Sequence, residues 1–236
     1  MGHKVKASTT SESRLPGLTS IKVEPFIIDI ETLLENIQPF LQTNILIINI
    51  PSKNIDGFRN LIKEIEKSEI EKVIFVSSTS VYENNNKTIL ESDCEELTSH
   101  PLLAIENLFR NSNKIKATIV RFGGLIGYSR NPGKFFSDGR FVDNPDSNVN
   151  LIHLDDCIGI ISRIVEQEVW GEVFNCCADT HPSKREFYTQ TAISAGVPTP
   201  RFANTDSKSF KIISNHKVKQ YLDYEFLHPD LMKIKF

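Results

Sequence analysis

The chain lacks the features that mark membrane, secreted or nucleic-acid-binding proteins. Its longest apolar run, Ile45 to Ile50, is interrupted by Asn49 and is far shorter than the roughly 20 residues that span a bilayer. The first ten residues have no apolar core of the kind a secretory signal needs. The 27 basic and 30 acidic side chains give a net charge of −3 without a basic block, which argues against nucleic acid as a partner. We therefore expect a cytoplasmic globular protein with no membrane or nucleic-acid partner.

Cysteines are few, and their spacing is not that of a metal site. Cys94, Cys157, Cys176 and Cys177 form no Cys-x-x-Cys pair and have no His-rich partner segment, so the sequence predicts no metal. We interpret all four as reduced thiols of a cytoplasmic protein. Cys176 and Cys177 are adjacent, and a vicinal redox pair is the alternative interpretation.

The chain also lacks Gly-x-Gly-x-x-Gly, the fingerprint that seats a dinucleotide pyrophosphate at a helix N-terminus. The nearest stretch, FGGLIG at 122–127, has Phe122 in the first glycine position, and a loop follows it instead of a helix. We interpret it as a turn whose backbone, at Phe122 and Gly123, lies close to a ligand.

Apolar strands and amphipathic helices alternate along most of the chain. Strands are expected at 23–30, 44–50, 71–76, 116–123 and 171–178, and helices at 31–41, 56–70, 98–111, 154–168 and 183–196. Asp56 and Asp155 are the expected N-caps of their helices, and Ser183 with Glu186 forms a capping box. This alternation predicts an α/β fold with a doubly wound, largely parallel sheet.

Doubly wound sheets bind ligands beyond the carboxyl ends of their strands. The loops after Ile50, Val76 and Phe122 are therefore the expected ligand positions. The stretch SSTSVY (77–82) occupies the second of them, so Ser77 and Ser78 are candidates to face a ligand. The alternative is a buried strand end that happens to carry hydroxyl groups.

The same stretch resembles the SSxxVY segment of extended short-chain dehydrogenase/reductases, the NAD(P)-dependent epimerase/dehydratase family. In that family the serine or threonine three residues before the valine holds the substrate oxygen, and here that residue is Ser78. ATIVRFGGLIG, with Arg121 and Gly127, is similar to the family's Arg-x-x-x-x-x-Gly turn. VNLIHLDDCIGII resembles its hxHxDD segment. HPSKREFYTQTA and KIISNHKVKQYLDYEFLHPD resemble the C-terminal part of the YeeZ-like subgroup.

The resemblance implies a Rossmann-like NAD(P)-binding core at 1–127 and a substrate-side segment at 128–236. It places Ser8, Thr9 and Thr10 at the adenosine ribose, where small hydroxyl residues favour NADP over NAD. A flexible N-terminal tail is the alternative for these three residues. Ile50 and Pro51 would line the nicotinamide half of the cofactor, although a strand ended by proline explains them equally well.

On the substrate side, the resemblance implies contacts from Tyr82, Asn150 and His153 with a nucleotide-sugar-like or other anionic small molecule. Arg130 and Lys134 flank a Pro-Gly turn, and such cations bind phosphate or carboxylate groups. The alternatives are a packing or capping role for His153 and a solvated loop for the two cations.

The family's Tyr-x-x-x-Lys pair, in which the lysine lowers the tyrosine pKa for proton transfer, is absent. Alignment on Glu106 puts Thr98 and Leu102 at the two positions. Two hypotheses follow: an NAD(P)-binding relative whose only candidate catalytic residue is Ser78, or a non-catalytic nucleotide-binding or scaffold protein. The helix at 98–111 resembles the family's dimer helix, which makes a homodimer the expected assembly.

The family's first strand, glycine loop and first helix have no counterpart in this sequence. We expect an N-terminally shortened version of a longer protein, through an expression boundary or a start codon assigned too late. The absent strand would lie between the second and fourth of the family's sheet. Its loss predicts two unpaired sheet edges, marginal stability and poor NADPH binding.

Overall fold

A computed structural model describes residues 2–32, 34–204 and 209–236 of the chain. Its strands are β1 (Lys6–Thr9), β2 (Glu24–Ile27), β3 (Ile45–Ile48), β4 (Lys72–Ser78), β5 (Thr88–Ile89), β6 (Lys116–Phe122), β7 (Gly124–Ile126), β8 (Phe141–Val142), β9 (Leu151–His153), β10 (Val173–Cys176), β11 (Arg201–Phe202) and β12 (Ile212–Ile213). Its helices are α1 (Leu15–Ser20), α2 (Ile55–Glu66), α3 (Pro101–Arg110), α4 (Leu154–Glu166), α5 (Lys184–Ser194) and α6 (His216–Tyr221), with short 3-10 helices η1 (Glu12–Arg14), η2 (Thr79–Val81), η3 (Glu91–Asp93), η4 (Pro132–Lys134) and η5 (Leu231–Lys233).

The chain forms two compact units. Unit 1 contains residues 1–75 and 101–117, and unit 2 contains 76–100 and 118–236. The polypeptide therefore passes between the units three times, and one passage lies within β4. The boundaries of these compact units differ from the domain boundary at residue 127 that the sequence predicts.

Parallel strand pairs dominate the sheets, as the alternation of strands and helices predicts. The largest sheet has four strands in the order β10-β6-β4-β3, with β3 parallel to β4 and β6 parallel to β10. A separate two-stranded parallel sheet joins β1 to β2. In the described part of the chain, β1 pairs only with β2 and β3 only with β4, so both strands have one unpaired edge.

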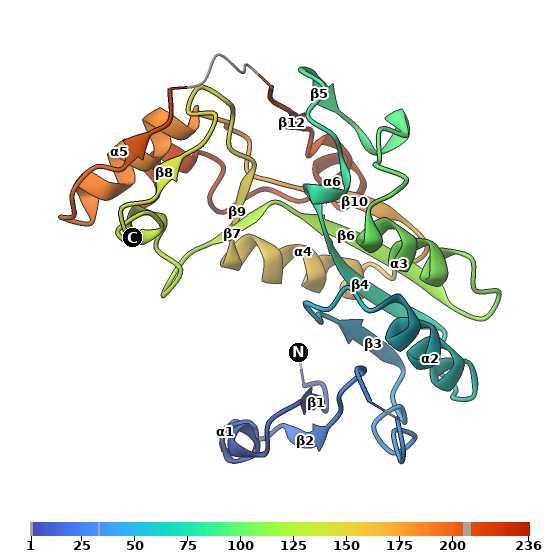
Figure 1. The fold of residues 1–236 in the computed structure, drawn as a ribbon. Helices are drawn as coiled ribbons and strands as arrows, with labels where there is room; N and C mark the ends of the chain where they lie inside the picture. The colour runs from blue at the N-terminus through green and yellow to red at the C-terminus, as the bar shows by residue number, and fades with distance from the viewer. Residues whose placement is uncertain (1, 33, 205–208) are drawn as a thin grey trace. The chain divides into compact units, whose positions relative to one another are not determined.

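In unit 1, α2 packs beside α3 (Figure 1), and aromatic side chains join both helices to Phe75 in the first part of β4. The rings of Phe75 and Phe109 stack with centroids 4.9 Å apart, and Phe58 meets Phe75 edge-on at 5.7 Å. All three side chains are fully buried. The apolar face of α2, spaced as a helix requires, thus forms the core that its sequence predicts.

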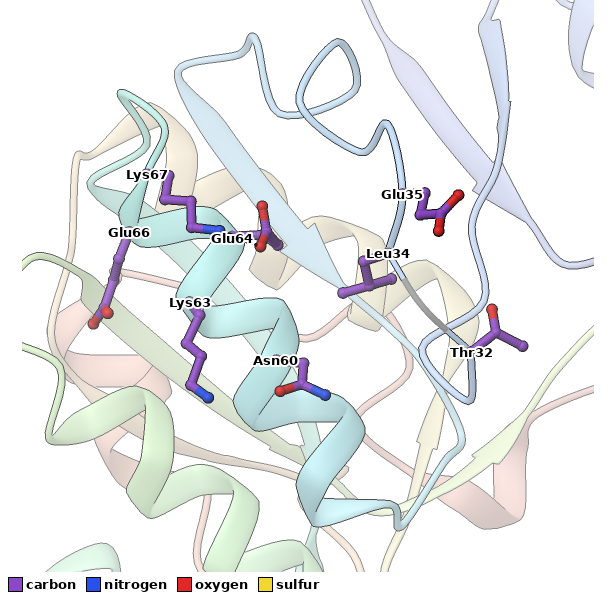
Figure 2. A pocket seen from close by; sticks show the side chains of 8 residues that line it. All are labelled: Thr32, Leu34, Glu35, Asn60, Lys63, Glu64, Glu66 and Lys67. Atoms are coloured by element: carbon purple, nitrogen blue, oxygen red, sulfur yellow. Dashed lines mark hydrogen bonds and ion pairs between the residues drawn. The ribbon is translucent and has the colours of Figure 1, made fainter.

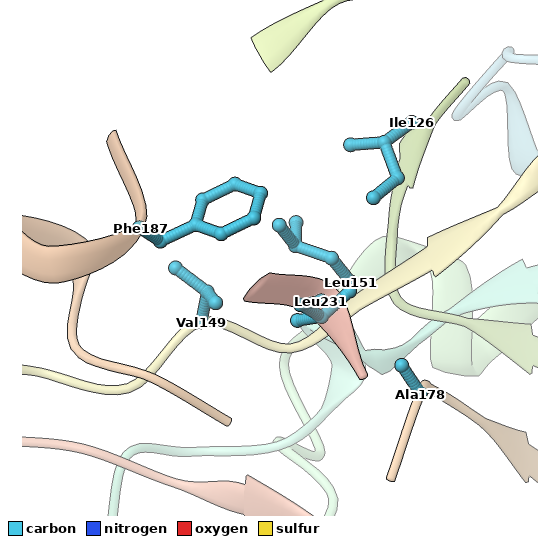
Figure 3. Close-up of a cluster of buried hydrophobic side chains, with 6 residues drawn as sticks. All are labelled: Ile126, Val149, Leu151, Ala178, Phe187 and Leu231. Carbon is cyan, nitrogen blue, oxygen red and sulfur yellow. The ribbon is translucent and has the colours of Figure 1, made fainter. Parts of the chain in front are cut away.

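Unit 2 has a core that draws on widely separated segments. Figure 3 shows Ile126, Val149, Leu151, Ala178, Phe187 and Leu231 packed against one another. Strand β7 pairs with β9 parallel, which brings Ile126 and Leu151 into this cluster. The cluster joins α5 and the C-terminal segment to these two short strands.

The helix expected at 31–41 does not form; apart from residue 33, which lies outside the described residues, this segment consists of turns. Asn36 has a left-handed backbone with φ of +59°, and Pro39 cannot donate a helical hydrogen bond. The apolar residues Ile37 and Leu41 are nevertheless buried. Turns therefore bury the apolar residues whose spacing had suggested a helix.

Two helix starts also differ from the expectation. Asn54, two residues before Asp56, caps α2 by accepting the Gly57 N–H at 3.0 Å. His153 caps α4 through Nδ1, which accepts the Asp155 N–H at 3.2 Å. The two aspartates lie in the first turns instead, where their charge favours the helix dipole. None of the helices in the described ranges is long and apolar enough to cross a membrane.

Candidate functional site

The carboxyl end of β4 carries the serines that the sequence singled out. Ser77 is buried and Ser78 is half-buried. The Ser78 hydroxyl oxygen accepts the Ser80 N–H at 3.1 Å and thereby caps η2. A serine that accepts through its oxygen can still donate its O–H. Ser78 is therefore placed to donate a hydrogen bond to an oxygen beyond the strand end.

A buried polar network in unit 2 surrounds Arg121 of β6. The Arg121 guanidinium is fully buried and donates to the Tyr82 hydroxyl at 2.5 Å and to a Glu96 carboxylate oxygen at 2.7 Å. The Tyr82 hydroxyl in turn donates to Asn175 Oδ1 at 2.9 Å. Burial raises the pKa of Tyr82 to about 12 despite the nearby guanidinium. Tyr82 is 2% exposed, so its hydroxyl serves the network.

Asn175 of β10 leaves part of this network unsatisfied. Its backbone N–H donates to a Glu91 carboxylate oxygen at 2.7 Å, and burial raises the pKa of Glu91. Its side-chain nitrogen Nδ2 is buried and has no hydrogen-bond partner. A buried polar atom without a partner costs about 1–3 kcal/mol, so Asn175 Nδ2 is the point at which this network is least stable.

The FGGLIG turn is explained by close packing. Phe122 is buried, and the Gly123 N–H donates to the Cys176 carbonyl at 2.9 Å. A Cβ at Gly123 would lie 2.6 Å from the Asn150 carbonyl oxygen and 2.8 Å from Cys177 Sγ. Asn150 itself bonds the segment around β12, with Nδ2 donating to the Lys211 carbonyl and Oδ1 accepting the Ile213 N–H. These contacts give Gly123 and Asn150 structural roles.

A second polar group gathers where β9 meets α4. His153 Nδ1 and His228 Nε2 lie 3.3 and 3.0 Å from the same Asp155 oxygen, Oδ2. Tyr128 donates its hydroxyl to the other oxygen, Oδ1, at 2.7 Å. The two imidazole rings are 3.8 Å apart between centroids. The sequence pointed to His153, but Tyr128, Asp155 and His228 were not among its candidate site residues.

The two candidate cations of the 128–148 loop lie at the surface. Arg130 donates from Nε to the Leu125 carbonyl at 2.7 Å and lies over the Phe135 ring. Lys134 is exposed at the end of η4, which Asn131 caps. Both cations remain accessible to an anion, while the backbone of the turn is fixed.

The candidate cofactor residues of unit 1 lie at two strand ends. Ser8 and Thr9 end β1 and Thr10 follows it; Ser8 and Thr10 are exposed, and Thr9 Oγ1 accepts the Ser11 N–H. Ile50 and Pro51 follow β3, which ends at Ile48. Residues 6–9 thus form a strand, and its hydroxyls lie at its carboxyl end.

Unit 1 also contains a cavity of about 640 Å³. Figure 2 shows its lining: Thr32, Leu34, Glu35, Asn60, Lys63, Glu64, Glu66 and Lys67. Four of the eight belong to α2, and Lys67, the residue that follows the helix, pairs with Glu64 at 2.6 Å. Helix α2 starts after the carboxyl end of β3 and runs back, so its last turns lie toward the amino ends of the strands. No candidate site residue lines this cavity.

The positions expected for a catalytic tyrosine and lysine hold other residues. Thr98 is exposed and precedes α3, which begins at Pro101 and not at residue 98 as expected. Leu102 lies in the first turn of α3. Neither side chain carries a group that titrates near neutral pH.

Known proteins similar to this chain share its fold over nearly its whole length. Protein YeeZ of Escherichia coli strain K12 is 28% identical over 243 residues, covering 97% of this chain and 87% of YeeZ. The structure of dTDP-glucose 4,6-dehydratase from Bacillus anthracis strain Ames with NAD aligns with a TM-score of 0.78 and 15% identity, covering 98% of this chain and 86% of that one. UDP-glucuronic acid 4-epimerase from Bacillus cereus, with UDP-glucuronic acid and NAD, aligns with a TM-score of 0.73 and 16% identity, covering 93% and 82%.

At such identities these two structures establish the fold alone. The Rossmann-like α/β fold expected from the sequence is confirmed. No protein-family model matches the chain.

Proposed function

This chain is a homologue of protein YeeZ and has the fold of NAD-dependent epimerase/dehydratases, and we propose that it binds an NAD(P)-type dinucleotide. We also propose that it binds an anionic, nucleotide-sugar-like small molecule. Tyr–Lys proton transfer is not part of its activity. The structures with similar folds hold NAD, and one of them also holds a sugar nucleotide.

One observation carries this proposal: the arrangement of Ser78. Its oxygen accepts from the Ser80 backbone at the carboxyl end of a parallel strand, which fixes the hydroxyl where doubly wound sheets bind ligands. The O–H then donates to a carbonyl or hydroxyl oxygen of the bound molecule. Ser78 orients the ligand, and its hydroxyl needs no change of protonation to do so.

The residues of this chain fit a dinucleotide in part. Ser8, Thr9 and Thr10 offer hydroxyls at the end of β1, and hydroxyl groups suit a ribose 2′-phosphate better than an acidic residue would. This supports our proposal of NADP over NAD. No Gly-x-Gly-x-x-Gly cradle is present for the pyrophosphate, so we propose that the dinucleotide binds weakly. When bound, such a cofactor supplies hydride transfer.

The chain's own residues bind and orient without moving a proton. Thr98 and Leu102 occupy the positions of the missing acid–base pair, and the burial of Tyr82 that raises its pKa to about 12 leaves that hydroxyl protonated at neutral pH. On the proposed substrate side, Arg130 and Lys134 attract a phosphate or carboxylate. Arginine and lysine bind such groups by charge-assisted hydrogen bonds.

The test is a titration with NADPH, followed by its fluorescence and by the melting temperature of the protein. A ligand at 100 times its dissociation constant stabilises a protein by about 2.7 kcal/mol. We expect no measurable shift at micromolar NADPH, and a small shift only at millimolar concentration. Micromolar affinity would contradict our account of the missing cradle. No binding at any concentration would favour the second candidate, a non-catalytic scaffold, which the absence of the Tyr–Lys pair supports.

The role of Ser78 is tested by Ser78→Ala, with Ser80→Ala as a matched control because Ser80 contributes its backbone N–H and not its hydroxyl. We expect Ser78→Ala to weaken ligand binding by about 0.5–1.5 kcal/mol, the net contribution of one hydrogen bond. A carbonyl reductase activity that falls about a thousandfold in Ser78→Ala, roughly 4 kcal/mol of transition-state stabilisation, would instead make Ser78 a catalytic residue.

The anion site is tested by Lys134→Glu, with Lys235→Glu as a control of equal charge change. Both lysines are exposed, so neither substitution should change the melting temperature. We expect only Lys134→Glu to abolish binding of phosphorylated or carboxylate ligands. Equal affinity in both variants would assign Lys134 to a solvated loop.

A further inference from the structure

Three side chains from two distant parts of the sequence meet at the start of α4. His153 ends β9, Asp155 lies in the first turn of α4, and His228 lies in the C-terminal segment, 73 residues from Asp155. Their ligand atoms all lie within 4.8 Å of one another. Asp155 Oδ2 is 3.0 Å from His228 Nε2 and 3.3 Å from His153 Nδ1. For comparison, a tetrahedral ion with bonds of 2.0–2.1 Å holds its ligand atoms about 3.3 Å apart.

Surrounding hydrogen bonds hold the carboxylate and His228 in place. Tyr128 occupies Asp155 Oδ1, which turns Oδ2 toward the two imidazoles. The fully buried Asp156 accepts the backbone N–H groups of Leu227 and His228 at 2.7 and 3.1 Å. Metal ligands in proteins are oriented by outer hydrogen bonds of this kind.

The ring of His153 is fixed by its neighbours. A Cβ at Gly127 would lie 2.5 Å from Nε2, so this nitrogen faces the Gly127 backbone, and Nδ1 faces Asp155. Nδ1 accepts the Asp155 N–H at 3.2 Å and is therefore not protonated there. An ion bound at Nδ1 would replace this hydrogen bond, because the nitrogen has a single lone pair for one partner or the other.

The charges suit a cation. The Asp155 carboxylate supplies a negative charge beside the two imidazoles. Asp155 and Asp156 also offset the positive end of the α4 dipole.

We propose that His153, Asp155 and His228 bind a divalent transition-metal ion, with Zn²⁺ as the best fit. Two imidazoles and one carboxylate form a donor set that zinc uses, leaving a fourth position for water. The side chains of Asp155 and His228 are each 30% exposed, which gives the ion access from solvent. The ion would tie the C-terminal segment to β9 and α4.

The first experiment is calorimetric titration of the full chain with Zn²⁺ after treatment with a chelator. We expect one ion per chain, and no binding of Mg²⁺, which prefers oxygen ligands. His228→Ala and Asp155→Asn should each lower the affinity about 100-fold, and Tyr128→Phe about 10-fold. His216→Ala, which removes another histidine of unit 2, is the matched control and should bind as the unchanged protein does. Failure to bind Zn²⁺, or equal affinity in His228→Ala, overturns the proposal.

A second measurement needs no variant and covers the case in which a substituted chain does not fold. Addition of paramagnetic Co²⁺ should broaden the imidazole NMR signals of His153 and His228 and leave those of His100 and His216 sharp. Broadening centred on any other histidine would place the ion elsewhere and overturn the proposal.

Discussion

The two units bury different kinds of side chain. The core of unit 1 centres on the aromatic rings of Phe58, Phe75 and Phe109, which contact one another through their faces and edges. Unit 1 also buries Glu106, but buried charged and polar side chains are more numerous in unit 2, among them Arg121 and Asp156, both fully buried. Aromatic packing thus dominates the core of unit 1, and unit 2 depends more on buried hydrogen bonds.

This difference explains why unit 2 carries most of the polar candidates for function. A buried guanidinium or carboxylate is retained only where partners satisfy it, and those partners fix the directions of side chains near the strand ends. Rings packed by shape tolerate other apolar residues of similar volume. The two units should therefore respond differently to the same kind of substitution. Trp170, the only tryptophan, lies in unit 2, so its fluorescence follows that unit.

The largest effect is expected for Arg121→Ala. The substitution leaves the Glu96 carboxylate and the Tyr82 hydroxyl without the guanidinium that bonds both. Removing one partner of a buried ion pair destabilises a protein by about 3–5 kcal/mol. Urea unfolding followed by Trp170 fluorescence measures this loss. A loss below about 1 kcal/mol, the value of an exposed pair, would mean that water reaches the network.

Two conservative substitutions compare the units directly. Tyr82→Phe keeps the ring but removes the hydroxyl that bonds Arg121 and Asn175, and should cost about 1–3 kcal/mol because buried polar groups lose a partner. Phe109→Leu in unit 1 roughly keeps volume and loses no polar contact, and should cost less than about 1.5 kcal/mol. Unfolding monitored by far-UV circular dichroism gives both values. The comparison fails if Phe109→Leu is the more damaging change.

The sequence predicted much of the fold because its signals there are local. The spacing of apolar residues in α2 predicts which face of the helix is buried. The apolar runs of β4 and β6 predict the bounds of these strands to within a few residues. The helix expected at 31–41 was wrong because Asn36 and Pro39 favour turns, and apolar spacing alone does not distinguish buried turns from a helix.

Candidate site residues could be named from the sequence only where they share a motif. Ser78 and His153 stand in short recognisable segments, so the sequence could name them as candidates. His228 and Asp155 are 73 residues apart in the sequence and come together only in the fold. No local sequence pattern predicts such a contact. Asn175 was read as part of a strand, which it is; its unpartnered amide nitrogen is a property of packing alone.

A smaller effect is expected from pH. Burial lowers the pKa of both His153 and His181 from the usual 6.5, and both lie in unit 2. The unfolded chain therefore binds more protons than the folded one below pH 6.5, so the stabilisation is complete above that value and is lost as pH falls. The Trp170 melting temperature should drop between about pH 7.5 and about pH 5.5, with a shallower slope in His153→Gln. An unchanged slope in that variant would assign the dependence to other groups.

The smallest effect is expected for Gly17→Ala in α1 of unit 1. A Cβ at Gly17 meets no atom within 4 Å, and alanine in a helix is favoured over glycine by about 0.5–1 kcal/mol. The variant should therefore be more stable by that amount in unfolding followed by circular dichroism. Gly127→Ala is the contrasting change in unit 2, because Gly127 has a φ of +113° and its Cβ would lie 2.5 Å from His153 Nε2. It should be destabilising. Should Gly17→Ala shift the circular dichroism midpoint and leave the Trp170 midpoint unchanged, the two units unfold separately; a common shift would mean that they unfold as one.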